Sequence, residues 1–170
     1  MIDEQTQSAL EDYYRRLVRQ SWSYQNIMGQ DKAWTAFTPT LTFTTPGDLS
    51  VTYTRRLGSY TKMGRTVIAS VAIVTSAFTH TTAAGNMQVT GFPFTSISTA
   101  GTATVGALQW SGMILLAGYT QVTAQLTAGS TTMVAIASGT AVASTNVTAA
   151  EMPTGGSVIL RANLTYETTV

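Results

Sequence analysis

A long stretch without charge is the feature that most restricts how this chain can fold. No Asp, Glu, Lys or Arg occurs between Arg65 and Glu151. Threonine, serine, alanine and glycine replace them, and only 10% of the whole chain is charged, against about 25% in an ordinary soluble domain. Threonine is β-branched, which restricts χ1 and favours strands. The stretch therefore predicts β-structure whose surface consists largely of hydroxyl groups.

From Trp34 onward, apolar and hydroxyl side chains alternate. The segment FTPTLTFTT, which begins at Phe37, has one apolar face and one threonine face, as in a half-buried strand. Pro39 marks the start or the edge of a strand. LSVTYT repeats the alternation, and glycine and proline turn signals separate six further candidates, at residues 66–75, 86–90, 107–117, 121–126, 132–137 and 157–166. About eight short strands at this spacing predict an antiparallel β-sandwich of jelly-roll type.

Residues 1–33 have a different composition from the rest of the chain. More than half of all the charges lie there, with most of the acidic residues early and the arginines late, an order that stabilises a helix through its dipole. Ser8 and Glu11 have the spacing of a capping box, and Gly29 is expected to end the helix. We expect two domains, an N-terminal helix in residues 1–33 for attachment or trimerisation and a β-sandwich in residues 34–170.

The predicted helix carries a row of residues spaced three and four apart, here called the helix seam. Its members are Leu10, Tyr13, Leu17, Gln20, Tyr24 and Ile27. Such a row fits a single amphipathic helix packed on its own domain, and it also fits a short coiled coil around an oligomer axis. A β-domain with few charges has poorly protected edge strands, which favours association between subunits.

Groups that could catalyse a reaction are scarce from residue 34 onward. A Ser-His-Asp triad would need His80, which is expected in an exposed loop, and Asp48, yet no Gly-x-Ser-x-Gly elbow surrounds a serine. Glycosidase carboxylates would have to come from Asp48, Glu151 and Glu167, and nothing in the sequence brings these together. The chain has one histidine, so a metal site would need three copies around a threefold axis to supply several histidine ligands. No glycine-rich phosphate loop is present. We therefore expect no enzyme activity, no catalytic residues, no metal site and no cofactor.

The segment YTRRLGSYTKMGRT, residues 53–66, holds four of the nine Lys and Arg residues. Basic residues interleaved with tyrosines could bind nucleic acid. Alternatively, the segment is a β-hairpin with a basic rim, in which Gly58 and Gly64 form turns or bulges. Its inward-facing residues would then be Tyr53, Leu57, Tyr60, Met63 and Val67. A net charge of +1 gives nucleic acid or an anionic membrane little to attract, and the apolar runs are too short to span a bilayer. We expect the hairpin, with no nucleic-acid partner and no membrane insertion.

Three motifs together resemble a known pattern. They read WTAFTPTLTF, YTRRLGSYTKMGRTV and GNMQVTGFPF, and they are similar to a pattern in the C-terminal β-domain of bacteriophage tail fibres and related spike or fibre-tip proteins. The resemblance covers roughly residues 34–94, and Phe92 stands where leucine is commoner. The residues that match the pattern are Trp34, Pro39, Gly58, Tyr60, Lys62, Gly64, Gly85, Asn86, Gly91 and Pro93.

The resemblance implies a trimerising β-sandwich behind a helical stem, with the matching residues as scaffold. It implies an exterior virion protein, namely a homotrimeric short tail fibre or fibre tip that attaches to the host cell. The partners would be other copies of the chain, tail, baseplate or capsid proteins, and a host surface glycan or protein. The alternative is a capsid decoration or cement protein that reinforces the phage head. The sequence does not identify the receptor-binding residues, and the exposed loops at 79–85 and 95–106 are the candidates.

Overall fold

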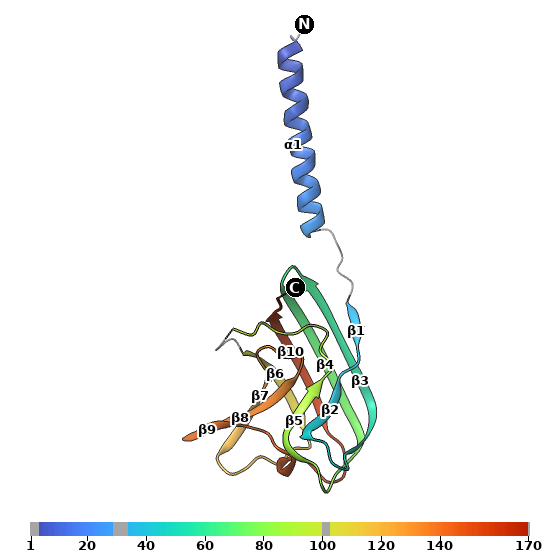
Figure 1. Cartoon of the computed structure of the whole chain (residues 1–170), viewed down its shortest axis with the longest axis vertical. Helices are drawn as coiled ribbons and strands as arrows, with labels where there is room; N and C mark the ends of the chain where they lie inside the picture. The colour runs from blue at the N-terminus through green and yellow to red at the C-terminus, as the bar shows by residue number, and fades with distance from the viewer. Residues whose placement is uncertain (1–3, 29–33, 100–102, 170) are drawn as a thin grey trace. The chain divides into compact units, whose positions relative to one another are not determined.

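The chain folds into two compact units, Met1–Ala33 and Trp34–Val170. A computed structural model describes residues 4–28, 34–99 and 103–169. Within the helix, it describes the side chains of residues 6–8 and 10–19. Figure 1 shows a single helix in the first unit and a curled antiparallel sheet in the second. The expected class, mainly β with one N-terminal helix, is confirmed.

The helix α1 spans Glu4–Met28. It begins four residues before Ser8, so Ser8 lies inside the helix and the predicted capping box with Glu11 is wrong. The side chains of Leu10, Tyr13 and Leu17 in the helix seam are exposed, as are those of two neighbours, Tyr14 and Val18. The remaining seam side chains, of Gln20, Tyr24 and Ile27, and the predicted helix end at Gly29 lie outside the described part of the chain.

The β-unit is one ten-stranded sheet that curls around a hydrophobic core (Figure 1). The strands lie side by side in the order β1-β3-β4-β10-β6-β7-β8-β5-β2, with β9 paired to β8. Each pair of neighbouring strands is antiparallel. The jelly-roll connectivity stays a prediction. The elements are β1 Thr35–Phe37, β2 Thr40–Thr45, β3 Ser50–Met63, β4 Thr66–Thr79, β5 Ala84–Thr90, β6 Thr104–Ser111, β7 Tyr119–Leu126, β8 Met133–Gly139, β9 Val142–Asn146, the 3₁₀ helix η1 Ala149–Glu151, and β10 Ile159–Glu167.

The strands β3 and β4 form the hairpin that the basic segment predicted. A two-residue turn at Gly64 and Arg65 closes it between the paired residues Met63 and Thr66. Gly64 has φ +58°, which suits glycine at the first position of such a turn. The pairing skips Thr54, and this β-bulge moves the side chains that follow it to the opposite face of the sheet.

The bulge overturns part of the expected packing. Leu57 and Met63 are exposed, although they were expected to face inward with Tyr53. Tyr53 and Tyr60 do pack against the core. Because the side-chain period of a strand is two, one extra residue is enough to exchange the faces, and simple alternation along the sequence does not reveal it.

Gly58 lies within β3 and not in a turn or bulge, so that expectation is wrong. It pairs with Phe37 of β1, and the Phe37 ring lies directly over it. A Cβ atom at position 58 would approach Phe37 Cζ to 2.6 Å, well inside van der Waals contact. The absent side chain therefore provides the space in which the Phe37 ring packs.

We predict that Gly58→Ala destabilises the β-unit. The added methyl group would push the Phe37 ring off the sheet, and overpacking of this kind costs about 1–3 kcal/mol. Gly155→Ala is the matched control, because a Cβ atom there meets nothing within 4 Å and the φ angle of Gly155 is not in the left-handed region. Thermal and urea unfolding should show a lowered stability for the first variant only. Equal stability of the two variants would contradict the role given to Gly58.

Candidate binding site at the loop end of the β-unit

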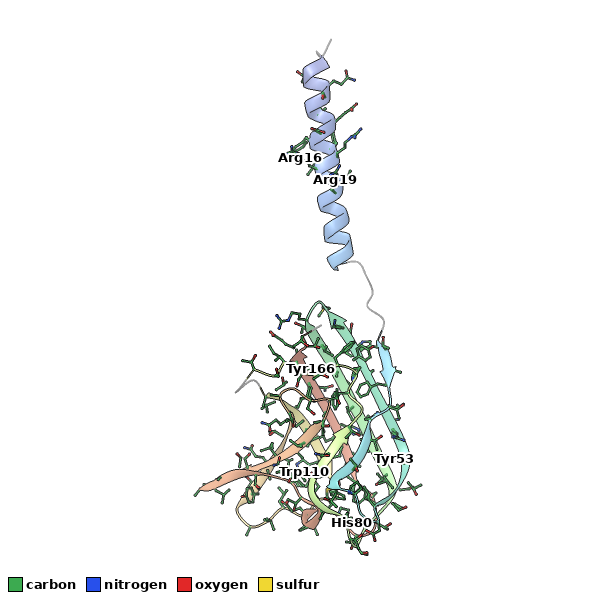
Figure 2. All side chains as sticks on the ribbon, in the orientation of Figure 1. Arg16, Arg19, Tyr53, His80, Trp110 and Tyr166 are labelled. Atoms are coloured by element: carbon green, nitrogen blue, oxygen red, sulfur yellow. The ribbon has the colours of Figure 1, made fainter. Side chains whose placement is uncertain are left out.

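Three of the few titratable groups of the β-unit gather at one end of it. Asp48 lies in the turn between β2 and β3, His80 follows β4, and Glu151 ends η1. Figure 2 shows His80 at this end and Tyr166 toward the opposite end. The segment that includes His80, residues 79–85, is one of the two loops that the sequence singled out for contact with a receptor.

Asp48 fastens the loop after β4 to the turn before β3. Its Oδ1 accepts hydrogen bonds from the Thr81 and Thr82 backbone N–H groups at 2.9 and 2.7 Å. The two threonine hydroxyls donate to its carboxylate at 2.6 and 3.0 Å. These bonds, led by the one from the Thr81 hydroxyl, hold the pKa of Asp48 well below its ordinary value of 3.8. Both carboxylate oxygens are thus engaged within the protein, and the loop is held in one position.

His80 is buried, with 7% of its surface exposed, and its expected place in an exposed loop is wrong. Its ring packs edge-on against Phe43 and Phe78, with centroid distances of 5.1 and 5.6 Å. Nε2 is buried and has no hydrogen-bond partner among the described residues. The imidazole therefore packs as part of the core beneath the loop, where it supports the position of Thr81.

Glu151 is also buried, with 1% of its surface exposed. Its Oε2 accepts hydrogen bonds from the Thr148 backbone N–H at 2.8 Å and from the Thr148 hydroxyl at 3.2 Å, which caps η1. Its backbone carbonyl accepts a bond from the Ile114 N–H at 2.8 Å. The side chain thus holds the start of η1, and the backbone carbonyl anchors η1 to the loop between β6 and β7.

A hollow of about 480 Å³ lies between the loop after β4 and η1. Its walls combine methyl groups and threonine hydroxyls, from His80, Thr81, Ala83, Ala149, Ala150, Met152 and Thr154. Ile114 and Leu116 project into solvent from the loop that is bonded to η1. Small apolar and hydroxyl groups on a fixed frame suit hydrogen bonding and van der Waals contact with a ligand.

The opposite end of the β-unit carries the third predicted carboxylate, Glu167. It lies 4.0 Å from the Arg65 guanidinium, and both side chains are exposed. A hollow of about 490 Å³ there is lined by Thr66, Ile97, Thr104, Thr165, Tyr166 and Glu167. Burial raises the pKa of Tyr166 to about 12. Ile97 and Thr104 belong to the second predicted contact loop, 95–106, of which residues 100–102 lie outside the described ranges.

Aromatic rings from all three motifs meet in one cluster, which includes two of the predicted scaffold residues, Tyr60 and Lys62. The Phe37 ring contacts Tyr60 and Phe92, with centroids 6.3 and 5.5 Å apart. The Phe94 ring contacts Tyr60 at 5.3 Å and receives the Lys62 ammonium at 5.1 Å.

The remaining motif residues occupy turns and strand ends. Gly91 has φ +96°, and a Cβ atom there would lie 2.7 Å from the Thr38 carbonyl oxygen. Gly85 has φ +79°, and Asn86 pairs with Thr148 in an isolated antiparallel β-bridge. Pro39 is buried directly before β2, Pro93 is half-buried, and Trp34 is exposed.

The basic residues of the hairpin mostly contact the protein itself. Arg56 Nε donates to the Pro39 carbonyl at 2.7 Å, its guanidinium also bonds to the Thr40 hydroxyl, and it lies 4.8 Å over the Tyr53 ring. Arg65 Nε donates to the Thr168 carbonyl at 3.1 Å. These contacts give the basic side chains a structural role in the hairpin.

Across residues 4–28, 34–99 and 103–169, no group of three or more His, Cys, Asp or Glu side chains is placed to hold a metal ion. Within the same part of the chain, no helix has both the length and the apolar content needed to cross a bilayer.

Comparison with known proteins gives a likeness in fold. No protein-family model matches the chain, and no curated protein sequence matches it. Among solved structures, the chain is similar to the crystal structure of the Dettilon tailspike protein, with a TM-score of 0.55 and 18% sequence identity. The match covers 78% of this chain and 23% of the tailspike chain. The chain thus shares its fold with part of a tailspike and spans less than a quarter of that protein.

We predict that Asp48→Asn loosens the loop after β4 and lowers the melting temperature at neutral pH. The carboxylate accepts bonds from four donors, and an amide nitrogen cannot accept. A lowered pKa stabilises the fold above the unfolded value and loses that effect as the pH falls through the folded value. The difference in melting temperature between the unmodified protein and Asp48→Asn should therefore be constant above pH 3.8 and become smaller below it. Glu167→Gln, at an exposed pair, is the control and should change little. A gap that widens in acid would contradict this account.

Proposed function

We propose that the chain is a phage virion structural protein on the outside of the particle, a short tail fibre or fibre tip that attaches to the host cell surface. The observation that carries the proposal is the fold shared with a tailspike across 78% of the chain. The sequence motifs that resemble phage fibre domains support it as well, and aromatic rings from all three motifs meet in the cluster of Phe37, Tyr60, Phe92 and Phe94.

The two units would divide the work of attachment. The helix unit would join three copies and hold them to a tail or baseplate through the helix seam, whose described members Leu10, Tyr13 and Leu17 are exposed. Each β-unit would present its loop end to a host glycan or protein. Three weak sites on one particle bind with an avidity above that of any single site. The hydrogen bonds from Thr81 and Thr82 to Asp48 favour such binding. They fix the loop after β4 before a ligand binds, so little conformational entropy is lost on binding.

Attachment without turnover fits the placement of the acidic groups. Cleavage of a glycosidic bond needs two carboxyl groups that flank it. The Asp48 carboxylate is held by Thr81 and Thr82, the Glu151 side chain is buried, and Glu167 lies at the other end of β4. In this proposal, the purified protein leaves host capsule sugar intact. Turnover that disappears in Asp48→Ala or Glu151→Ala would point to an enzyme.

A capsid decoration protein that reinforces the head is the second candidate. The exposed apolar side chains on the outside of the sheet, such as Leu57 and Val105, favour packing against other proteins. Antibody labelling of particles in the electron microscope separates the two candidates. Label on tails supports the fibre, whereas label on heads, with protein released by mild treatment that leaves tails intact, supports decoration.

We predict that the purified protein competes with phage for host cells and that Ala150→Arg reduces this competition at least about tenfold. Ala150 is exposed and lines the hollow, so a large side chain there would obstruct the site. Ala143→Arg in β9 makes the same change at an exposed alanine outside the hollow, and it should compete like the unmodified protein. No competition by the unmodified protein would refute host attachment, and equal losses in both variants would refute the placement of the site.

We predict that Leu17→Glu converts the trimer to smaller species in sedimentation at low micromolar concentration. Leu17 is an exposed member of the helix seam, and a charge in an apolar seam opposes helix association. Gln7→Glu adds the same charge at an exposed position outside the seam and should leave the trimer unchanged. A monomeric unmodified protein would contradict trimerisation.

A further inference from the structure

The loop between β6 and β7, residues 112–118 and here called the apolar loop, carries the most exposed large apolar side chain of the described residues. Ile114 is 76% exposed and Leu116 is 56% exposed. The two residues that alternate with them are covered instead, since Met113 is buried and Leu115 packs against the core. The apolar loop thus alternates between side chains that hold it to the β-unit and side chains that project from it.

Backbone contacts hold the apolar loop in one conformation. The Ile114 N–H donates to the Glu151 carbonyl at 2.8 Å, and the Leu116 carbonyl accepts a bond from the first residue of β7 at 3.2 Å. Gly112 has φ +90°, and a Cβ atom there would lie 2.3 Å from the Ser157 carbonyl oxygen, so only glycine fits so close to the segment after η1. The two projecting side chains are therefore carried on a backbone that is fixed at both ends of the loop.

The core of the β-unit does not account for the two projecting side chains, because neither Ile114 nor Leu116 is part of it. Removing large apolar side chains from water is favourable, and exposed apolar groups that gather on one surface commonly mark a contact with another molecule. A partner that covered them would have little backbone to order, since the loop is already fixed. The apolar loop therefore has the properties of a preformed contact.

The surroundings of the two side chains are uncharged. The bond between Ile114 and Glu151 brings residues 112–118 and 149–157 together. These two segments contain one ionisable side chain, that of Glu151, and it is buried. They contain no aromatic residue and no Asn or Gln. Their exposed polar side chains are the hydroxyls of Thr154 and Ser157.

These surroundings discriminate between the classes of molecule on a host surface. Sugars are bound by aromatic faces and by carboxylate, amide or guanidinium groups that bond to neighbouring hydroxyls in pairs, and the two segments expose none of these. Tyr119, which follows the apolar loop, is half-buried, and its hydroxyl donates to the Ala143 carbonyl at 3.0 Å. Loops and helices that bind a lipid surface combine Trp or Tyr with Lys or Arg, and both segments lack these as well. An apolar protein surface requires none of these groups.

We propose that Ile114 and Leu116 anchor the β-unit to a host surface protein by entering an uncharged apolar groove of that protein. The proposal rests on the attachment function proposed above and narrows its ligand from a glycan or protein to a protein. The exposed Ala150 belongs to η1, which the apolar loop contacts, and it lines the hollow beside the loop after β4. The contact would extend to this hollow, which can receive a side chain of the partner.

An uncharged contact has its own response to salt. Salt screens charges and weakens charge-steered association, whereas an apolar contact persists and sulfate strengthens it. We expect the affinity for host cells to change less than about threefold between about 50 and 500 mM sodium chloride, where the Debye length is shorter than most distances across an interface. A tenfold loss of affinity over this range would contradict the proposal.

The test measures the binding of the labelled full chain to susceptible host cells by flow cytometry. Ile114→Asp and Leu116→Asp should each lower the apparent affinity at least about tenfold, because the contact would bury an unpaired carboxylate. Leu57→Asp is the matched control, at a leucine of β3 that is 60% exposed. This control and Ile114→Val, which keeps an apolar side chain, should each change the affinity less than about threefold. Circular dichroism and thermal unfolding check the fold of each variant.

Treated cells identify the class of the ligand. Digestion of the cell surface with proteinase K should remove the binding. Periodate, which oxidises the vicinal hydroxyls of sugars, should leave it unchanged. Vesicles of phosphatidylethanolamine and phosphatidylglycerol should not bind the protein.

Several results would overturn the inference and leave host attachment standing. Binding that survives proteinase K or is lost after periodate would indicate a glycan, and binding to the vesicles that Ile114→Asp weakens would indicate a lipid surface. Equal affinities of Ile114→Asp, Leu116→Asp and the Leu57→Asp control would remove the role of the apolar loop. A lack of binding to untreated cells would refute attachment itself, on which the inference rests.

Discussion

The β-unit depends on the burial of alternate side chains along β4. Val67, Ala69, Val71 and Ile73 all face the core, while the strand pairs with β3 on one side and β10 on the other. Few ion pairs are available in a chain with so little charge, so apolar burial and backbone hydrogen bonds must stabilise the sheet. A shift of one residue in β4 would turn its apolar set outward, which fixes the register of both neighbours and of the aromatic cluster beyond them.

The sequence was informative where alternation alone decides the structure. Most strand positions follow from it, but β6 ends at Ser111 because the apolar run after it forms a loop anchored by Ile114, and β9 was not expected at all. The sequence alone does not predict the bulge at Thr54 either, because the bulge depends on how β3 pairs with β4. The sequence predicts a turn or bulge at Gly58, because nothing in it indicates the Phe37 ring that covers this glycine.

The loop end was harder to predict than the sheet, for a physical reason. Its organisation rests on contacts between segments far apart in the chain, such as Asp48 with Thr81 and Ile114 with Glu151. A proline-glycine-aspartate turn predicts a bend but not the threonines that the carboxylate binds. His80 was expected in solvent because threonines surround it, yet Phe43 and Phe78 cover its ring. Local composition therefore identified the loop but misjudged the role of its histidine.

The placement of the acidic groups in the β-unit fits the proposed role in attachment. Catalytic groups must be free to exchange protons with a substrate, and here Asp48 is committed to the loop and Glu151 to η1. The same hydrogen bonds restrain the loop end, and a restrained loop loses less conformational entropy when it binds a ligand. In the proposed attachment role, the chain would bind through a loop end whose shape is fixed before any partner arrives.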